Sequence, residues 1–251
     1  MVMALSTTSS STAASSRVNA HRHGRFVALL GGVVVATALA ITLATGLSDT
    51  GHSATAARDG SSHQHAAPAA KTATRAAFHD EMRRLWEDHV TWTRLAIVTF
   101  ADGSAGFDAT AARLMQNQTD IGDAIKPFYG EAAGDRLTDL LEDHIGIAVE
   151  LLQAAKAGDD AAFAKAHTAW HANADDVADF LAAANPLFWP QDQMRAAMRD
   201  HLDQTLAEAG HELDGQYAAS VADYDEIHHH ILAMADVLST GIIRAFPHRF
   251  H

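Results

Sequence analysis

The sequence predicts an all-α protein, an antiparallel up-and-down bundle of four to five long helices preceded by an N-terminal hydrophobic export or anchor helix. From Ala76 onward, apolar residues recur at spacings of three and four, which is the period of a helix with one buried face. Proline and glycine fall between these runs, where helices end. Short connections between helices of similar length favour antiparallel neighbours.

Composition and periodicity divide the chain into five parts. They are a basic region 1–25, an apolar segment 26–47, a flexible linker 48–75, the helical bundle domain 76–247 and a short tail 248–251. Within the domain, long helices are predicted at 76–101, 131–157, 160–183, 191–213 and 217–245, with shorter helical pieces between Asp108 and Tyr129. The breaks coincide with turn-forming pairs such as Asp102-Gly103, Gly158-Asp159 and Asn185-Pro186.

The uncharged apolar segment 26–47 follows three arginines, Arg17, Arg22 and Arg25. It is long enough to span a bilayer, yet Ala54-Thr55-Ala56 downstream has the small-x-small form of a signal cleavage site. The segment is therefore either a transmembrane anchor or a cleaved signal peptide. In both cases the arginines hold the N-terminus in the cytoplasm, so the domain is expected outside it, secreted or anchored to the cell membrane by one helix.

Composition also limits the partners and cofactors. The chain has no cysteine, which excludes disulfides, zinc-thiolate sites, Fe-S clusters and c-type haem. Residues 76–251 carry 12 Lys and Arg against 29 Asp and Glu, so nucleic acid is not an expected partner, whereas cations and basic proteins are attracted. No glycine-rich phosphate loop or nucleophile elbow is present, so no nucleotide is expected and a non-enzymatic protein is favoured. The sequence identifies no protein partner.

The 17 histidines favour metal or proton chemistry, and three of them fall inside predicted apolar stripes. His89, His144 and His228 each lie near the middle of a predicted helix. Because antiparallel helices of similar length bring their midpoints to one level, these three imidazoles are expected to be buried in one layer.

His171, Asp175, His201 and Asp225 are expected on the flanks of the apolar stripes, near the same height, and complete the predicted site. Imidazole suits copper, zinc and iron, and without thiolates a three-histidine site completed by carboxylate or water is the expected form. The sequence therefore predicts a transition-metal site, with copper or zinc ahead of iron. Its candidate ligands are His89, His144, His228, His171, Asp175, His201 and Asp225.

An aspartate precedes three of the candidate histidines, in the repeated phrase Asp-His-aliphatic. Asp88, Asp143 and Asp200 are each rotated about 100° around the helix from the histidine that follows, so they cannot easily bond to its ring. They are expected instead to accept hydrogen bonds from histidines of neighbouring helices and to orient those rings.

Two alternatives remain open. In the first, a structural or protein-interaction bundle of the cell envelope uses its polar core only to fix the packing, since a buried neutral histidine with one hydrogen-bond partner is common. In the second, Glu208-x-x-His211 and Glu226-x-x-His229 form a ferritin-like di-iron site, whose ligands share this spacing. Helical geometry predicts, however, that neither pair points into the core.

Six motifs together resemble an uncharacterised family of bacterial exported or membrane-anchored helical-bundle proteins. They are LWEDHVTWTRLAIV, IKPFYG, AAKAGD, WHANADDVADFL, YDEIHHHILAMADVLSTGII and AFP, and the likeness runs from about Phe78 to Pro247. Members sometimes carry the names glycosyltransferase or acetylglutamate kinase, which this sequence does not support because it has no nucleotide-binding βαβ unit. The resemblance implies the domain boundaries and a polar signature of His89, Arg94, His144, Asn173, Asp175, His201, Asp225 and Asp236.

Overall fold

A computed structural model describes residues 74–251, and within this range it contains six α-helices, one 3₁₀ turn and no strand. The elements are α1 (Arg75–Ala101), α2 (Phe107–Tyr129), α3 (Glu131–Ala157), α4 (Asp160–Ala184), α5 (Gln191–Leu213), α6 (Tyr217–Ala245) and η1 (Pro247–Arg249). The prediction of an all-α domain is confirmed for this part of the chain. It holds six helices, where four to five long ones were expected.

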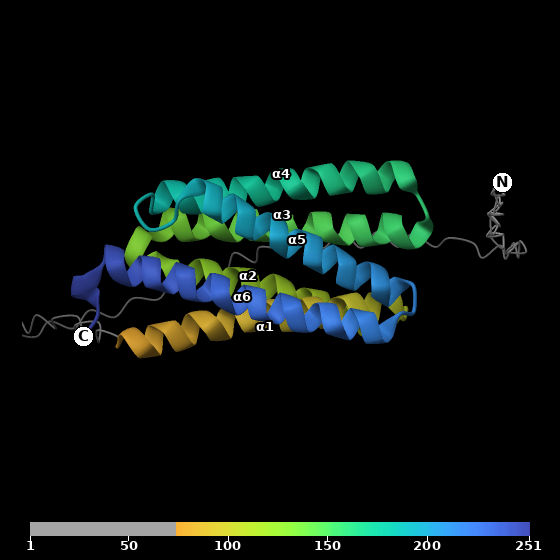
Figure 1. The fold of residues 1–251 in the computed structure, drawn as a ribbon, viewed down its shortest axis with the longest axis horizontal. Coiled ribbons are helices and arrows are strands. Elements are labelled where there is room, and N and C mark those ends of the chain that lie inside the picture. The colour runs from red at the N-terminus through yellow and green to blue at the C-terminus, as the bar shows by residue number, and fades with distance from the viewer. Residues whose placement is uncertain (1–73) are drawn as a thin grey trace, which may run out of the picture. The chain divides into compact units, whose positions relative to one another are not determined.

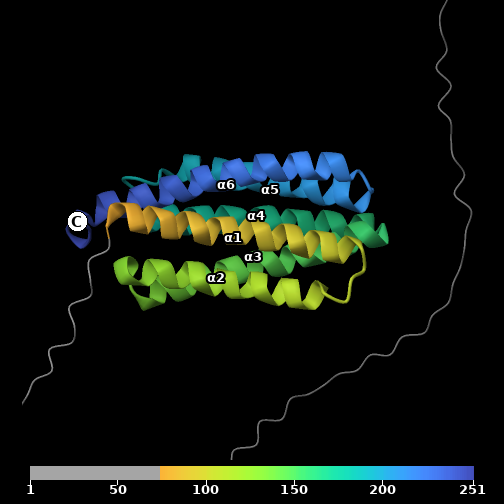
Figure 2. The same ribbon diagram turned by 90° about the horizontal axis from the view of Figure 1, so that it is seen from below.

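The six helices close into a ring around a shared core. Each helix packs against the helices before and after it in the sequence, and α1 packs against α6 (Figures 1 and 2). Consecutive helices run back and forth because the connections are short; only Gly130 separates α2 from α3. A ring of this kind gives every helix an inward face, so side chains from helices distant in sequence can meet at its centre.

Residues 107–129 form one helix of 23 residues, and the prediction of shorter pieces here was wrong. The buried face of α2 includes Asn117 and Gln118, so two amides interrupt the apolar pattern that would have marked a long helix. Pro127 also lies within α2, but in its last turn, where the missing N–H disturbs only the preceding turn. Gly130, with φ 87°, then ends the helix.

Local signals set the ends of several helices. Thr74 and Asp159 cap α1 and α4, because their side chains accept hydrogen bonds from the backbone N–H groups of Ala77 and Ala162, each at 3.0 Å. Helix α3 ends at Gly158, whose left-handed φ of 66° allows its N–H to bond back to the last turn. The predicted boundaries of α3 to α6 agree with the observed ones within one residue.

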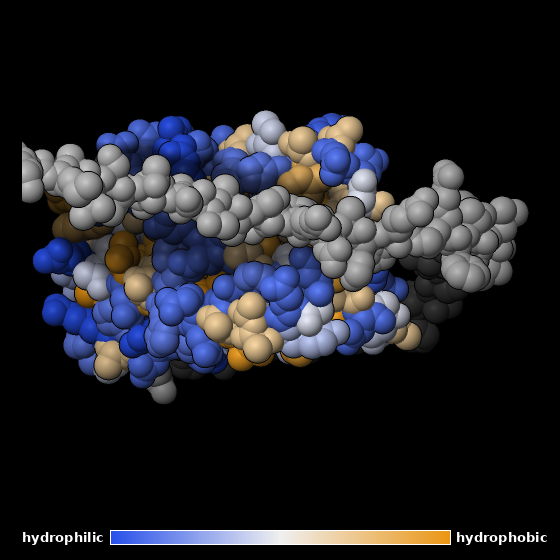
Figure 3. Space-filling view, turned by 45° about the vertical axis from the view of Figure 1, so that its right-hand side comes forward, coloured by the Kyte–Doolittle hydropathy of each residue, from blue (hydrophilic) through white to orange (hydrophobic). Residues whose placement is uncertain are grey.

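The surface of the domain is mainly polar around the apolar core. On the face drawn in Figure 3, hydrophilic residues predominate and apolar side chains are scattered among them. No helix within residues 74–251 is long and apolar enough to cross a membrane. The predicted basic region 1–25, the export or anchor segment 26–47 and nearly all of the linker 48–75 lie outside the described residues.

Candidate functional site

Three of the predicted ligand candidates meet inside the ring. His89 of α1, His144 of α3 and His201 of α5 are buried, with exposed fractions of 3%, 3% and 4%. All three line one cavity of about 50 Å³. The sequence placed His201 on the flank of α5, and this was wrong, because His201 stands on the same buried face as Met198 and Leu202.

The rest of the cavity wall is almost entirely apolar. It consists of side chains from α1, the start of α2, α3, α4 and α5, including the ring of Trp170. The two hydroxyls in the wall, of Thr93 and Thr205, are already used: each donates at 2.8 Å to the backbone carbonyl four residues earlier, that of His89 or His201. The imidazole nitrogens are therefore the main polar groups that a ligand in this cavity would meet.

His144 is held in one tautomer. The amide of Asn173 donates from Nδ2 to the backbone carbonyl of Leu140 at 3.0 Å, which fixes its Oδ1 as the acceptor facing His144. His144 Nδ1 lies 2.8 Å from that oxygen, so Nδ1 carries the proton and donates it. The lone pair of the ring is thereby assigned to Nε2, which forms no hydrogen bond within the described residues. The ring also stacks on Trp170, with centroids 5.2 Å apart.

His89 is supported by the two buried amides of α2. Gln118 Nε2 donates to the carbonyl of Leu114 at 2.7 Å and faces His89 Nδ1 at 3.4 Å. Its neighbour Asn117 donates to the carbonyl of Leu85 at 3.0 Å, which ties α2 to α1 beside the imidazole. The amides that broke the apolar pattern of α2 are thus the groups that surround His89.

His201 is the least satisfied of the three rings. Its Nδ1 is buried and has no hydrogen-bond partner anywhere in residues 74–251. The ring lies 5.8 Å from that of His89, centroid to centroid, and 6.2 Å from the nearly parallel ring of His230. A buried polar atom without a partner costs free energy, and Nε1 of Trp170 in the same cavity wall is also without a partner among the described residues.

The three imidazoles are neutral near pH 7. Burial lowers the pKa of His144 to about 4, although its hydrogen bond to Asn173 acts in the opposite direction. Burial, followed by repulsion from His144, lowers the pKa of His89 to about 4. Burial and the neighbouring histidines hold the pKa of His201 well below its ordinary value. Each ring therefore keeps a lone pair, as a metal ligand must.

Amides, and not the preceding aspartates, contact His89 and His144, so the prediction of orienting carboxylates was wrong. Asp88 accepts a hydrogen bond from Arg84 at 2.9 Å, and Asp143 and Asp200 are exposed. A residue next to an inward-facing histidine is turned toward the outside of the ring. Neutral amides are also cheaper to bury than carboxylates, which would need a paired cation.

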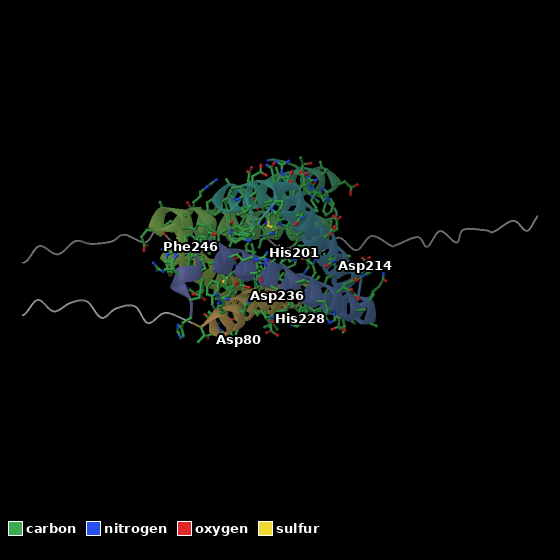
Figure 4. All side chains as sticks on the ribbon, turned by 60° about the vertical axis from the view of Figure 1, so that its left-hand side comes forward. Asp80, His201, Asp214, His228, Asp236 and Phe246 are labelled. Atoms are coloured by element: carbon green, nitrogen blue, oxygen red, sulfur yellow. The ribbon has the colours of Figure 1, made fainter. Side chains whose placement is uncertain are left out.

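His228 does not join the buried layer, contrary to the prediction. Its side chain is 29% exposed, and its Nε2 lies 3.0 Å from Oε1 of Glu87 on α1. Figure 4 shows His228 near α1 and apart from His201. Asp225, one turn earlier on α6, is exposed as well.

The remaining two candidates lie together between α4 and α5, outside the cavity. Asp175 accepts two hydrogen bonds from Arg199, at 2.8 and 2.9 Å. His171 is half-buried and faces His167, with their Nε2 atoms 3.2 Å apart. Of the seven predicted ligands, therefore, the structure brings His89, His144 and His201 to one cavity and places the other four elsewhere.

Sequence reasoning missed a buried ionic cluster that lies near the cavity. Arg94 of α1 contacts Glu208 and Glu212 of α5, with N···O distances of 2.8 and 3.2 Å, and Ser220 of α6 donates to Glu212 at 2.6 Å. Burial raises the pKa of Glu208 to about 7, although Arg94 acts in the opposite direction. The signal was available, since Arg94 belongs to the polar signature given above.

The pair Glu208-x-x-His211 does not act as one unit. Glu208 points inward, contrary to the prediction, and is 1% exposed. His211 lies at the surface instead, with Nδ1 2.5 Å from Asp223 Oδ2. Glu226 and His229 are both exposed. Neither pair thus presents the inward Glu and His of a ferritin-like di-iron site.

The three imidazoles do not form a closed coordination shell. Within residues 74–251, no group of three or more His, Asp and Glu side chains is arranged to hold a metal ion.

Comparison with family models, with curated proteins and with solved structures gives no match. The resemblance to exported bundle proteins therefore stays a prediction, and a function has to be inferred from the site itself.

Proposed function

We propose that this protein is a non-enzymatic helical bundle that binds a transition-metal ion in the cavity lined by His89, His144 and His201. Copper or zinc is favoured ahead of iron, because the donors are imidazoles without thiolate and with no carboxylate in the cavity wall. The observation that carries the proposal is the meeting of three buried, neutral imidazoles from three helices at one cavity.

The cavity suits an ion better than a large organic ligand. Its volume is about 50 Å³, whereas one water molecule needs roughly 10–15 Å³ in the same measure. An ion with one or two water molecules fits this space. The hydrogen bond from His144 to Asn173 is also the usual support of a metal-bound histidine, whose second nitrogen donates to a carbonyl or carboxylate. Binding would require rotation of the rings toward one point.

One observation favours a structural bundle as the second candidate. His144 stacks on Trp170, and His89 lies edge-on to Trp86 with centroids 5.8 Å apart, as core side chains do. In that case the histidines only fix the packing, and the acidic surface binds a basic partner of the cell envelope. This candidate predicts one melting temperature, whether or not copper or zinc is added.

The deciding experiment is metal analysis of the full chain, purified natively and dialysed against glycine to remove weakly held ions. We expect about one tightly held equivalent in wild type and in the control His228→Ala, and its loss in His144→Ala and His201→Ala. His201→Gln keeps a polar side chain and serves as a second variant, should His201→Ala fail to fold; it should also lose the metal. No tightly held metal in wild type, or equal amounts in all variants, would exclude the core site.

We also propose that the segment 26–47 exports the protein, so that the bundle works outside the cytoplasm, secreted or anchored. The arginines before this segment and its apolar length support the proposal. A reporter enzyme fused after His251 should be active only outside the cytoplasm. Activity inside would contradict export, and the mass of the mature chain separates an anchor from a cleaved signal peptide.

A further inference from the structure

Two histidines of α4 face each other at the surface, away from the cavity. His167 and His171 are one helical turn apart, and their rings lie 4.4 Å from centroid to centroid. Their Nε2 atoms are 3.2 Å apart, and both side chains are half-buried. Histidines at positions i and i+4 lie on one helical face, which is the spacing that many helical zinc sites use.

The separation of the two nitrogens matches that of two ligands on one metal ion. A zinc–nitrogen bond is about 2.0–2.1 Å, and in a tetrahedral shell two such nitrogens lie roughly 3.3 Å apart. His167 and His171 are at 3.2 Å without any rearrangement of the helix. In the metal-free protein, a proton between the two nitrogens explains the same distance, with one ring donating to the other.

A carboxylate of the neighbouring helix is within reach of this pair. Oδ1 of Asp203 on α5 lies 4.0 Å from Nε2 of His171. The Asp203 side chain is 71% exposed, so a rotation of its carboxylate toward the histidines is unobstructed by burial. The nearby Asp175 is held by both of its oxygens to Arg199 and stays out of the pair.

We propose that His167, His171 and Asp203 form a second metal site, which takes a divalent transition ion such as Zn²⁺ or Cu²⁺. Two imidazoles and one carboxylate supply three ligands, and water completes the shell. Because the site is open to solvent, its ion exchanges readily, unlike an ion held in the buried cavity. The proposal rests on the α4–α5 surface alone and does not depend on the core site.

The test is a titration of the full chain with Zn²⁺ alone, read out by competition with a chromophoric chelator. We expect a class of weaker sites in wild type whose affinity falls at least about tenfold in His167→Ala and in His171→Ala, since even supporting groups of a metal site contribute roughly tenfold. His229→Ala removes an exposed histidine of α6 and serves as the control. Asp203→Asn should weaken binding and leave the site present.

The same experiment separates this proposal from the core site. His144→Ala should leave the weaker class of Zn²⁺ sites unchanged, and His171→Ala should leave the tightly held ion unchanged. Cu²⁺ added to wild type should show coupling to two nitrogens by electron paramagnetic resonance, and this signal should be lost in His167→Gln, which keeps a polar side chain. If both alanine variants bind Zn²⁺ as His229→Ala does, the surface site does not exist.

Discussion

The inward face of α5 buries polar groups in two opposite ways. At His201, three uncharged imidazoles surround a cavity, and no charged side chain lies in its wall. About two turns further along the same helix, Glu208 and Glu212 share the guanidinium of Arg94, and Ser220 completes the bonding. The first region keeps its imidazoles uncharged and leaves His201 Nδ1 without a hydrogen-bond partner. The second region pairs its two carboxylates with one guanidinium.

This contrast supports the proposal that the cavity, and not the ionic cluster, binds a ligand. A closed ionic cluster has its donors and acceptors matched, so it requires no ligand to explain it, and its role is to join α1, α5 and α6. The unpartnered His201 Nδ1 has no such compensation among the described residues. Burying a polar atom without a partner costs about 1–3 kcal/mol, which a bound ion would offset.

The largest effect is expected from breaking the ionic cluster. Arg94→Met leaves Glu208 and Glu212 buried without their cation, which should lower the free energy of unfolding by about 3–5 kcal/mol. Urea denaturation at pH 8 measures this change. Arg84→Ala is the matched control, because Arg84 is an exposed arginine of the same helix, and it should cost less than about 1 kcal/mol. Equal losses in both variants would show that the cluster contributes nothing special.

A second, smaller effect separates the two regions by pH. His89 and His144 have a folded pKa of about 4 against an ordinary 6.5, so their contribution is complete above pH 6.5 and is lost as the pH falls through 4. The pKa difference of each histidine corresponds to about 3 kcal/mol in the free energy of unfolding. Glu208 has a folded pKa of about 7 against 4.5, so its contribution is complete below pH 4.5 and is lost as the pH rises through 7.

Between about pH 4.5 and 6.5, His89 and His144 make the protein more stable as the pH rises, and Glu208 makes it less stable. Because the two histidines outnumber the one glutamate, the free energy of unfolding should rise over this range. Glu208→Gln removes the opposing contribution, so its unfolding free energy should rise more steeply over the same range. Chemical denaturation at half-unit pH steps provides both curves. A variant curve parallel to that of wild type would show that Glu208 does not titrate near pH 7 in the folded protein.

The fold could be predicted from the sequence to a large extent, because apolar spacing reports directly which residues are buried. On α1 the stripe was right, and Phe78, Met82 and His89 are buried. On α6 the core face was misplaced, because the apolar spacing of this helix includes Tyr217 and Val221, which are 59% and 51% exposed. Such exposed apolar residues are ordinary, but here they shifted the inferred core face of α6 toward His228.

The site was harder to predict for a related reason. The buried residues of helix α5 alternate between apolar and polar, and include His201, Thr205, Glu208 and Glu212, so apolar spacing alone cannot locate its core side. The direction of that face follows from closure of the six-helix ring, which depends on all six helices together. Local periodicity contains no information about a neighbour more than a hundred residues away, such as Arg94 opposite Glu208.

The smallest effect is expected at His228, the residue that most sharply separates sequence expectation from structure. His228 pairs with Glu87 at a partly exposed interface of α1 and α6, so His228→Ala should change the free energy of unfolding by less than about 1 kcal/mol. His201→Ala enlarges a buried cavity and should cost more, about 2 kcal/mol or above. Urea denaturation of the two variants at pH 7.5 compares them directly. If His228→Ala lowers the unfolding free energy more than His201→Ala does, the partly exposed pair of His228 and Glu87 contributes more to the fold than the buried imidazole does. That result would contradict the assignment of His201 to the core.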